Sequence, residues 1–387
     1  MKMRLAIFSD CVHMKDNAGN VGSDIHIFVK QIEALSIYFS EIHLFCPFVD
    51  FDNSIAITTY STKNIHFYPQ KKVGGSTLKH KLSIIQQIPN WFASYRKANQ
   101  LADIVYQRYP NNINLPGFFY FYFLRKKVFA TFTGTWGKNN IESYTYRLQK
   151  WMLKNLFRGP VGVYSNEEIN SKKIFKSFSP SYSASEWQEE ELQIESRLTE
   201  IKQNGFQKIS MVTVGSFVSY KNQQYILDTC CQLKNLEIPF ELYMVGDGEL
   251  RNQYENFIAK HQLQNEVKLT GKITNNEVRK IYRKVNFVVQ SPSYEGFGKV
   301  PLEAYFHGAL PIINNITLAP YITQNGSLGV TFSIDDKDGL LNVLKHLKKN
   351  PNEVIDRIRR SREFVKEFTL EKWAESYITK INEFYNS

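Results

Sequence analysis

The 387-residue chain has only four cysteines, and no two of them stand in a CxxC spacing. Cys230 and Cys231 are adjacent, a pattern that suits neither a zinc knuckle nor a disulfide framework. We therefore expect free thiols and a reducing compartment, the cytoplasm, for this protein.

Long hydrophobic runs are also absent. The longest apolar stretch, residues 115–124, is about half of the ~20 residues that a membrane span requires, and it contains Pro116 and Gly117. Near the N-terminus, the apolar run of residues 5–8 is too short for the core of a signal peptide and predicts a buried first strand instead. We expect no membrane-spanning segment.

Acidic residues are scarce in one part of the chain. Residues 53–141 contain twelve lysines and arginines but a single acid, Asp103, so this stretch carries a surplus equal to the net charge of +11 of the whole chain. A positive field confined to one domain attracts an anionic partner, such as a phosphate, an anionic bilayer or a nucleic acid. A basic surface that serves only solubility is the alternative.

The chain does contain a regular alternation of short apolar runs with helical patterns, which is typical of parallel sheets built from βαβ units. Its length also exceeds the usual size of one hydrophobic core. We predict an α/β protein with two doubly wound, Rossmann-like domains that bind ligand at the carboxyl ends of their strands. The predicted strands lie at residues 4–9, 41–47, 103–108, 127–133 and 161–166, and at 208–215, 240–246, 266–271, 285–291 and 310–315.

An acidic, polar segment that ends at Gly205 separates the two series of strands, and we place the domain boundary within it. The N-terminal domain then covers residues 1–189 and the C-terminal domain covers residues 190–366. The final residues, 367–387, have apolar side chains at helical spacing and predict an amphipathic helix that packs back on the N-terminal domain.

Residues 291–308 read SPSYEGFGKVPLEAYFHG, and they follow a predicted buried strand and lead into a helix predicted to start at Pro301. The loop therefore lies at the carboxyl end of a strand and next to a helix N-terminus, where free backbone N–H groups and the helix dipole favour an anion. Gly296 and Gly298 allow the backbone to approach a ligand closely, because they have no Cβ. The pattern predicts a phosphate site.

Two glutamates, Glu295 and Glu303, belong to the same string. A carboxylate beside a phosphate would repel it, so we expect both side chains to accept hydrogen bonds from neutral hydroxyl groups. For each glutamate alone a structural role is the alternative. Glu303 would complement the helix dipole, and Glu295 would be a solvent-exposed loop residue.

The string resembles the E-x7-E signature of the retaining glycosyltransferases of the GT-B fold, specifically family 4, the glycosyl transferases group 1, in which E-G-F-G-x-x-x-x-E-A is typical. The resemblance implies two Rossmann-like domains that face a central cleft. It also implies that Glu295 holds the donor sugar and that Glu303 binds the ribose hydroxyls of a nucleotide sugar. The diphosphate would be held by the backbone amides of Gly296, Phe297 and Gly298.

Other segments resemble the same family. The string VTVGSFVSYKNQQYILD is similar to its strand-loop-helix segment, which implies that Lys221 neutralises the leaving diphosphate and acts with Glu295 as a catalytic residue. Ser216 stands at a donor-binding position where the family usually has an arginine, so one diphosphate contact is weakened or supplied from elsewhere. Gly271 and Lys272 stand where the family's backbone contacts the nucleotide base.

The resemblance is less exact in the N-terminal half. Gly19 and Gly22 correspond to a loop that approaches the donor phosphate and often has two adjacent glycines, whereas here the glycines are separated. Thr133 stands where many relatives have a histidine that contacts the 6-hydroxyl of the sugar, which leaves a pentose, a 6-deoxy sugar or a differently held hexose open. His13 and His26 are near enough in sequence to line the cleft, although a lone histidine is more often structural.

Two D-x-D strings occur, at Asp50 and Asp52 and at Asp336 and Asp338. Such pairs hold a divalent ion in the other major glycosyltransferase fold, but neither string here has a matching context. We expect solvated loop charges, no metal and no cofactor, because Lys221 and a helix dipole can neutralise a diphosphate.

Residues 76–97 combine basic residues with an aliphatic and aromatic side, a composition that suits an anionic bilayer surface. A helix that only covers the N-terminal sheet is the alternative. The expected partners are a nucleotide-sugar donor, a glycan or lipid-linked acceptor and an anionic membrane surface, but no nucleic acid. The expected location is the cytoplasm, peripherally on the inner face of the cytoplasmic membrane.

Three functions are compatible with these observations. The preferred one is a retaining glycosyltransferase that moves a sugar from a nucleoside-diphosphate donor, with UDP favoured, to a hydroxyl of a glycan or lipid-linked acceptor in bacterial surface-polysaccharide assembly. A nucleotide-sugar epimerase of similar fold would release no nucleoside diphosphate. A non-catalytic nucleic-acid-binding module would bind random RNA in a salt-sensitive way, but the chain has no RRM, KH or helix-turn-helix signature.

Overall fold

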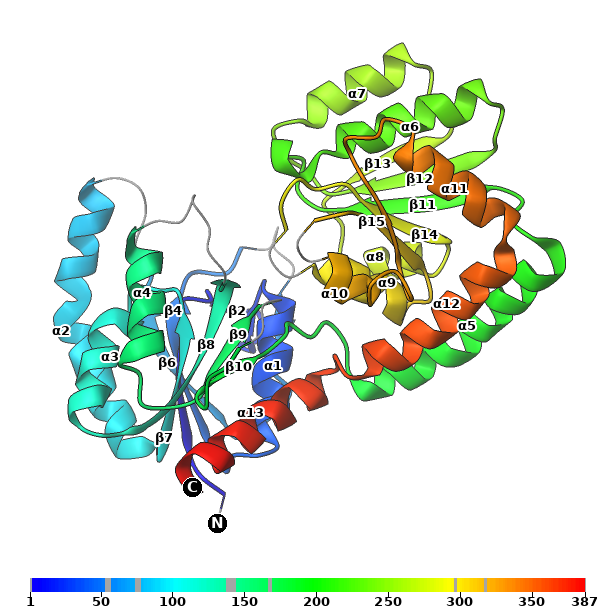
Figure 1. Ribbon diagram of the computed structural model, residues 1–387. Helices are drawn as coiled ribbons and strands as arrows, with labels where there is room; N and C mark the ends of the chain where they lie inside the picture. Colours follow the sequence, from blue (N-terminus) through cyan, green and yellow to red (C-terminus); the bar gives the residue numbers. More distant parts are fainter. Residues whose placement is uncertain are drawn as a thin grey trace. The chain divides into compact units, whose positions relative to one another are not determined.

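The computed structural model describes residues 2–52, 57–73, 78–136, 144–165, 169–295, 298–316 and 319–386 (Figure 1). For residues 78–82 and 135 it describes the backbone only. The contacts divide the chain into two compact units. Unit 1 is formed by Met1–Pro180 with Leu370–Ser387, and unit 2 by Ser181–Thr369.

Unit 1 is built on a parallel sheet. Among its described residues this sheet has seven strands in the order β10-β9-β8-β7-β1-β4-β6, and every pair of neighbours is parallel. The strands are β1 (Leu5–Phe8), β4 (Ile42–Phe48), β6 (Ile65–Lys71), β7 (Ile104–Tyr109), β8 (Lys127–Thr135), β9 (Val161–Tyr164) and β10 (Ile174–Lys176). A second, antiparallel sheet consists of β2 (Met14–Lys15), β3 (Val21–Ser23) and β5 (Thr58–Thr59).

Helices cover both faces of the parallel sheet of unit 1 (Figure 1). They are α1 (His26–Ser36), α2 (Leu78–Leu101), α3 (Asn114–Phe123), α4 (Tyr144–Asn155) and α13 (Leu370–Asn386). Successive side chains of a strand point to opposite faces, so Leu5 and Ile7 of β1 are buried with α1 and α13. Ala6 and Phe8 are buried with α2, α3 and α4. The alternation along one short strand thus serves two cores.

The C-terminal helix α13 belongs to unit 1, although it follows unit 2 in the sequence. Its buried residues Trp373, Tyr377 and Ile381 lie in the same core as Leu5 of β1. These positions are part of the apolar stripe that predicts an amphipathic helix.

Unit 2 has a second parallel sheet, in which the described strands follow the order β13-β12-β11-β14-β15-β16. The strands are β11 (Ile209–Val214), β12 (Phe240–Val245), β13 (Val267–Gly271), β14 (Phe287–Gln290), β15 (Leu310–Asn314) and β16 (Val330–Phe332). The helices are α5 (Ala184–Asn204), the 3-10 turn η1 (Ser219–Lys221), α6 (Gln223–Asn235), α7 (Arg251–Lys260), α8 (Asn275–Tyr282), α9 (Lys299–Phe306), α10 (Ala319–Thr323), α11 (Gly339–Lys349) and α12 (Pro351–Lys366).

The first six strands of the two parallel sheets have the same order. Numbered by their order in the sequence within each parallel sheet, the strands run 3-2-1-4-5-6 in unit 2 and 3-2-1-4-5-6-7 in unit 1. The order reverses between β11 and β14 and between β1 and β7. Ligands of open α/β sheets bind outside the carboxyl ends of the strands at such a switch point, so each unit offers one place where a site is expected.

The predicted fold class, α/β with two doubly wound Rossmann-like units, is confirmed, and a strand is present at each of the ten predicted positions. Six observed strands were not predicted: β6, β10 and β16 of the parallel sheets, and β2, β3 and β5 of the antiparallel sheet. β6 is an edge strand that contains Pro69, a residue that sheets tolerate at their edges but that argues against a strand in a sequence pattern.

The long helix α5 begins with a capping box, in which Ser183 and Glu186 each accept a hydrogen bond from the backbone N–H of the other. Ile194 and Leu198 of this helix are buried in the core of unit 2. The contacts therefore divide the chain before this helix, at Ser181, and not within it as the sequence analysis placed the boundary.

Within the described part of the chain, no helix combines the length and the apolar character that crossing a bilayer requires. All four cysteines are free thiols.

Candidate functional site

The loops that follow β11 and β14 meet at the switch point of unit 2. Gly215 directly follows β11 and has a φ of 155°, and a 3-10 turn then leads to Asn222, which has a left-handed conformation (φ 49°) and precedes α6. Gln223 secures this loop, because its Nε2 donates to the carbonyl oxygen of Ser216 at 3.0 Å. Lys221 is thereby held on a short, hydrogen-bonded turn rather than on a long loop.

The loop after β14 is hydrogen-bonded to the loop after β11. The Ser291 hydroxyl donates to the carbonyl oxygen of Asn222 at 2.7 Å, and the backbone N–H of Ser293 donates to that of Tyr220 at 2.8 Å. On its far side the loop is fixed by Asn314, which donates to the carbonyl oxygen of Pro292 at 2.9 Å. The two loops therefore form one connected structure.

Lys221 and Glu295 face each other across these loops and form an ion pair. Their side chains are 16% and 25% exposed, so the pair is half-buried but open to a ligand. The Lys221 ammonium also lies 5.6 Å from the centre of the Tyr220 ring. The structure thus brings together the two residues for which the sequence resemblance implies a catalytic role.

Gly298, with a left-handed φ of 70°, is the N-cap of α9, which begins at Lys299. The helix starts earlier than the predicted position, Pro301, so Glu303 lies in its second turn and not in the first. Gly296 and Phe297, for which a diphosphate contact was predicted, lie outside the described residues.

Glu303 is held at both carboxylate oxygens. The Ser181 hydroxyl donates to one oxygen at 2.9 Å, and the Tyr282 hydroxyl donates to the other at 3.0 Å. Burial, and then the neighbouring charge of Glu303, raise the pKa of Tyr282 well above its usual value, so Tyr282 stays a hydrogen-bond donor. Ser181 and Tyr282 are 122 and 21 positions away from Glu303 in the sequence, so no local motif indicates that they contact it.

A buried network lies behind Tyr282. Its ring stacks on His307 with a centroid distance of 5.5 Å, and His307 Nδ1 lies 3.3 Å from a carboxylate oxygen of Glu190, which also accepts from Arg283 at 3.0 Å. Burial would raise the pKa of Glu190, but the nearby His307 and the hydrogen bonds from Arg283 outweigh it and lower that pKa to about 2. The network therefore ties Glu190 of α5 to the support of Glu303.

Arg197 of α5 fixes the C-terminal ends of α8 and α9. One guanidinium nitrogen donates to the carbonyl oxygens of Tyr282, Arg283 and Val285, and the other to those of His307 and Gly308. These carbonyls lie at the last residue, the C-cap or just beyond the end of each helix, where helix carbonyls lack intrahelical partners and a cation is favourable. Arg197 thus helps to set the position of the helix that carries Glu303.

Three other predicted donor-binding residues line the same end of the sheet. Gly271 ends β13 with a φ of 69°, and its carbonyl oxygen accepts from Gly246 at the end of β12 at 3.0 Å. Lys272 and Ser216 are exposed. Gly246 has a packing reason to be a glycine, because a Cβ there would lie 2.0 Å from the carbonyl oxygen of Gly215.

The predicted residues of unit 1 lie on and beside its small antiparallel sheet. Gly19, with a φ of 84°, lies in the turn between β2 and β3. A Cβ at this position would have no atom within 4 Å. At Gly22 a Cβ would lie 2.4 Å from the carbonyl oxygen of Thr58, so the glycine is required for the pairing of β3 with β5.

His26 is the first residue of α1, and its Nδ1 lies 2.9 Å from the Thr58 hydroxyl. Thr133 lies near the carboxyl end of β8 and donates to the carbonyl oxygen of Tyr109 at 3.1 Å.

His13 is fully buried and has a partner at each ring nitrogen. Its Nδ1 lies 2.9 Å from the carbonyl oxygen of Cys11, and its Nε2 lies 2.9 Å from the Tyr60 hydroxyl. Burial lowers the pKa of His13 to about 4, so it is neutral at physiological pH. Its role in the described structure is structural.

A cavity of about 220 Å³ opens at the switch point of unit 1, and the sequence analysis did not identify it. The signal was available, because polar residues lie at or shortly after the carboxyl ends of the two strands that end here. These residues are Ser9 and Asp10 after β1 and Asn111 and Asn112 after β7. The lining also includes Gln70, Lys71, Trp91, Tyr146 and Gln149.

In the described residues, no group of three or more histidines, cysteines, aspartates or glutamates is arranged to hold a metal ion.

Comparison with known proteins identifies the unit that carries Lys221, Glu295 and Glu303. Residues 196–364 match the family model of the glycosyl transferases group 1. Unit 2 carries a group 1 glycosyltransferase domain. Across 173 residues the chain is 31% identical to an uncharacterised glycosyltransferase of Methanocaldococcus jannaschii, an alignment that covers 41% of this chain and 44% of that protein. The chain thus spans less than half the length of the curated relatives that it matches.

Solved structures extend the likeness of fold beyond the group 1 domain. A glycosyltransferase from Rickettsia africae matches with a TM-score of 0.69 and 14% identity, over 100% of this chain and 99% of that one. HepE of Anabaena, solved with UDP and glucose, matches with a TM-score of 0.68 and 12% identity, over 98% and 99%. At such identities the likeness concerns the fold, which is that of the GT-B glycosyltransferases.

Proposed function

We propose that this protein is a retaining glycosyltransferase that moves a sugar from a nucleoside-diphosphate donor to a hydroxyl of a glycan or lipid-linked acceptor. The observation that carries the proposal is the Lys221–Glu295 ion pair at the switch point of a group 1 domain. The pair offers one cation and one carboxylate to a ligand at the place where an open α/β sheet binds nucleotides. A UDP-sugar is the favoured donor, and HepE, which has the same fold, was solved with UDP.

Lys221 is assigned to the leaving diphosphate. A lysine is a compact point charge, and a cation preorganised where negative charge develops lowers the barrier to transfer. In the free protein Glu295 neutralises Lys221, so the diphosphate replaces a carboxylate as its partner. The N-terminus of α9, directly after Gly298, adds the positive end of a helix dipole to the same place.

The two glutamates are assigned to neutral hydroxyl groups of the donor. Glu295 binds the sugar and Glu303 the ribose. A carboxylate has about four lone-pair sites, and Ser181 and Tyr282 occupy one on each oxygen of Glu303. Two sites remain for a ribose diol, and the protein partners already fix the orientation of the carboxylate.

Ser216 leaves the diphosphate without the arginine that relatives usually supply. Lys299 follows Gly298 directly and begins α9, so we assign it as the second cation. With two lysines and a helix dipole available, the proposed reaction needs no metal ion. The acceptor hydroxyl attacks on the face from which the diphosphate leaves, and a departing phosphate oxygen takes its proton, so neither glutamate has to be a nucleophile.

The cavity at the carboxyl ends of β1 and β7 is assigned to the acceptor. Its lining is mostly polar and includes Gln70, Asn111 and Gln149, which suits the hydroxyl groups of a glycan. Gly19 borders open space and remains a candidate for the donor phosphate, and Thr133 and His26 remain candidates for the sugar or acceptor. The basic N-terminal half suits a phosphate-bearing, lipid-linked acceptor at the inner face of the cytoplasmic membrane, as in surface-polysaccharide assembly.

A thermal-shift screen with UDP-, GDP-, ADP- and dTDP-sugars tests this proposal. We expect one nucleotide series to stabilise the wild type and to stabilise Glu303→Ala less, because only binding to the folded state raises the unfolding temperature. If none of the four series stabilises the protein, the proposal fails. An epimerase would share the binding but would release no nucleoside diphosphate when an acceptor is supplied.

A further inference from the structure

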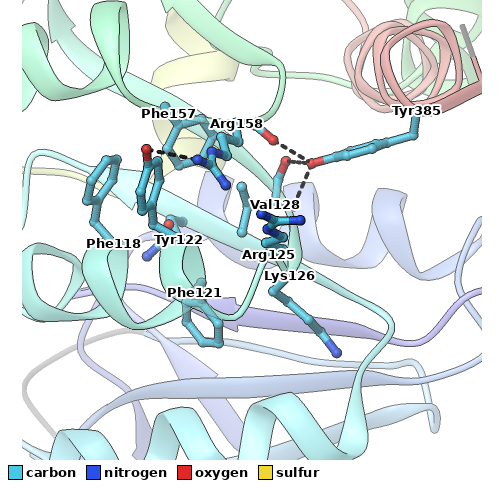
Figure 2. A pocket seen from close by; sticks show the side chains of 10 residues that line it. Phe118, Phe121, Tyr122, Arg125, Lys126, Val128, Phe157, Arg158 and Tyr385 are labelled. Atoms are coloured by element: carbon cyan, nitrogen blue, oxygen red, sulfur yellow. Dashed lines mark hydrogen bonds between the residues drawn. The ribbon is translucent and has the colours of Figure 1, made fainter.

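Unit 1 has a second cavity, of about 320 Å³, at the amino end of β8 (Figure 2). The cavity lies towards the end of the sheet where β8 begins, whereas the site assigned to the acceptor lies where β1 and β7 end. The two cavities share no lining residue. The volume of the second cavity falls within the range of ligand pockets, about 300–1,000 Å³. The lining residues are Gln107, Phe118, Phe121, Tyr122, Arg125, Lys126, Val128, Phe157, Arg158 and Tyr385.

The walls of this cavity are apolar. Phe118 and Phe121 of α3 are three positions apart, lie on one face of the helix and line the cavity together with Val128 and Phe157. The opposite face of α3 carries Phe123, which is 76% exposed. The run of aromatic residues in this helix thus supplies both the walls of the cavity and an apolar surface beside it.

The mouth of the cavity is basic. The Arg158 guanidinium stacks 3.9 Å from the centre of the Tyr122 ring and donates to the Tyr122 hydroxyl at 2.9 Å (Figure 2). Arg125, two residues after the end of α3, has a left-handed backbone (φ 51°). Lys126 donates to backbone carbonyls of α2 and of the residue after it. No carboxylate is among the described residues that line the cavity. Arg125 and Arg158 therefore present positive charge that an anionic ligand can neutralise.

The cavity also contains an unpartnered amide. Gln107 of β7 is fully buried, and neither its Nε2 nor its Oε1 has a hydrogen-bond partner among the described residues. Leaving both ends of a buried amide unpaired is unfavourable, and such a group calls for a ligand or a water molecule. Tyr385 of α13 closes one side, because its hydroxyl donates to the carbonyl oxygen of Val128 at 2.7 Å (Figure 2).

From these three features we infer that the cavity binds an anionic amphiphile. Its apolar chain packs against the phenylalanine walls, its phosphate or carboxylate binds Arg125 and Arg158, and a hydroxyl or ester carbonyl of the same molecule pairs with Gln107. A lysophosphatidic acid has all three groups. The ligand comes either from a membrane or from solution, and the two sources share this chemistry.

Binding to the full-length protein is measured by calorimetry with hexanoyl lysophosphatidic acid and with octyl phosphate, which lacks the ester and the hydroxyl. Arg125→Asn removes the charge, while asparagine tolerates the left-handed backbone. Lys172→Asn, at an exposed lysine that does not line the cavity, is the matched control. We expect Arg125→Asn to weaken the binding of both amphiphiles about tenfold or more, because it removes a cation assigned to their anionic group. A tenfold change in affinity corresponds to about 1.4 kcal/mol. Lys172→Asn should change the binding of neither amphiphile.

Gln107→Leu provides a second test that does not depend on charge. Removing an unpaired buried amide leaves the free protein as stable as the wild type or more stable. The variant should bind lysophosphatidic acid more weakly and octyl phosphate unchanged. The inference is overturned if neither amphiphile binds saturably, if Arg125→Asn binds like Lys172→Asn, or if Gln107→Leu weakens both ligands equally.

Sedimentation with vesicles identifies the source. If phosphatidic acid vesicles, but not phosphatidylcholine vesicles, retain the wild type and fail to retain Arg125→Asn, the ligand is a membrane lipid. If the soluble amphiphile binds and the vesicles do not retain the protein, the ligand is a soluble molecule. Both results support the site, and neither assay involves a nucleotide sugar, so the outcome is independent of the proposed transferase activity.

Discussion

Removing either partner of the Lys221–Glu295 ion pair should change the affinity for free UDP in opposite directions. Lys221→Met removes the cation assigned to the diphosphate, and a hydrogen bond to a charged group contributes about 1.5–3 kcal/mol. At about 1.4 kcal/mol per factor of ten, we expect UDP to bind roughly 10- to 150-fold more weakly. Glu295→Gln frees Lys221 from its carboxylate partner and removes a negative charge beside the diphosphate.

The gain from Glu295→Gln is smaller, because the pair is partly exposed and solvent screens it. Exposed ion pairs contribute at most about 1 kcal/mol, which corresponds to about fivefold tighter UDP binding. The intact UDP-sugar should gain less than free UDP does, because the same substitution removes the contact assigned to the sugar. Comparing both ligands therefore separates the electrostatic role of Glu295 from its binding role.

Isothermal titration calorimetry with UDP and the UDP-sugar measures these affinities, and unfolding without ligand reports any loss of stability. Lys208→Met is the matched control, since Lys208 forms an ion pair with Glu241 at 3.0 Å in the same unit but does not belong to the proposed site. If Lys221→Met behaves like the control, the assignment of Lys221 to the diphosphate is wrong. If Glu295→Gln also weakens UDP, Glu295 does not oppose the diphosphate in the way proposed.

Four further changes test other parts of the account. Glu303→Ala should raise the donor KM about tenfold or more while lowering kcat less, because it removes ribose contacts made before and during transfer; steady-state kinetics with an unchanged KM would contradict this role. Ser216→Arg should lower the donor KM by adding a further cation beside the diphosphate, and an unchanged or higher KM would contradict the placement of residue 216 next to the diphosphate. Arg197→Met should lower the unfolding free energy by about 3–5 kcal/mol in chemical denaturation, because several buried carbonyls lose a charged partner; a loss below 1 kcal/mol would contradict it. Glu190 has a depressed folded-state pKa, so its stabilisation is present above its unfolded pKa of about 4.3 and is lost as the pH falls towards about 2; Glu190→Gln should flatten the stability curve in this range, and an unchanged slope would refute the assignment.

Most of the fold could be predicted from the sequence, because the strands of both sheets are short apolar runs between helical patterns. Leu5 to Phe8 illustrate why the pattern is reliable: all four are buried, on alternating faces, so the whole run is apolar. The missed strand β6 lies at an edge, is only partly buried and contains Pro69, so its sequence resembles that of a loop. The missed strands β10 and β16 have three residues each, too few for a periodic signal.

The site could be predicted only as a set of separate residues. Lys221 and Glu295 are 74 positions apart, and their pairing follows from the adjacency of β11 and β14, which a single sequence does not reveal. The partners of Glu303 follow from the same cause, since Ser181 and Tyr282 come from a segment before α5 and from α8. For Gly22 the sequence suggests a ligand-binding role, but the structure gives this glycine another reason. It is required for the pairing of β3 with β5.

The stereochemistry of the transferred sugar is the sharpest test of the proposed retaining transfer. The nucleotide sugar selected by the thermal-shift screen is incubated with the protein and a hydroxyl acceptor, and the anomeric proton of the first product is followed by NMR. We expect a product with the anomeric configuration of the donor, and a rate reduced about 10²- to 10³-fold in Lys221→Met. An inverted product, or transfer that continues at the wild-type rate in Lys221→Met, would contradict this expectation.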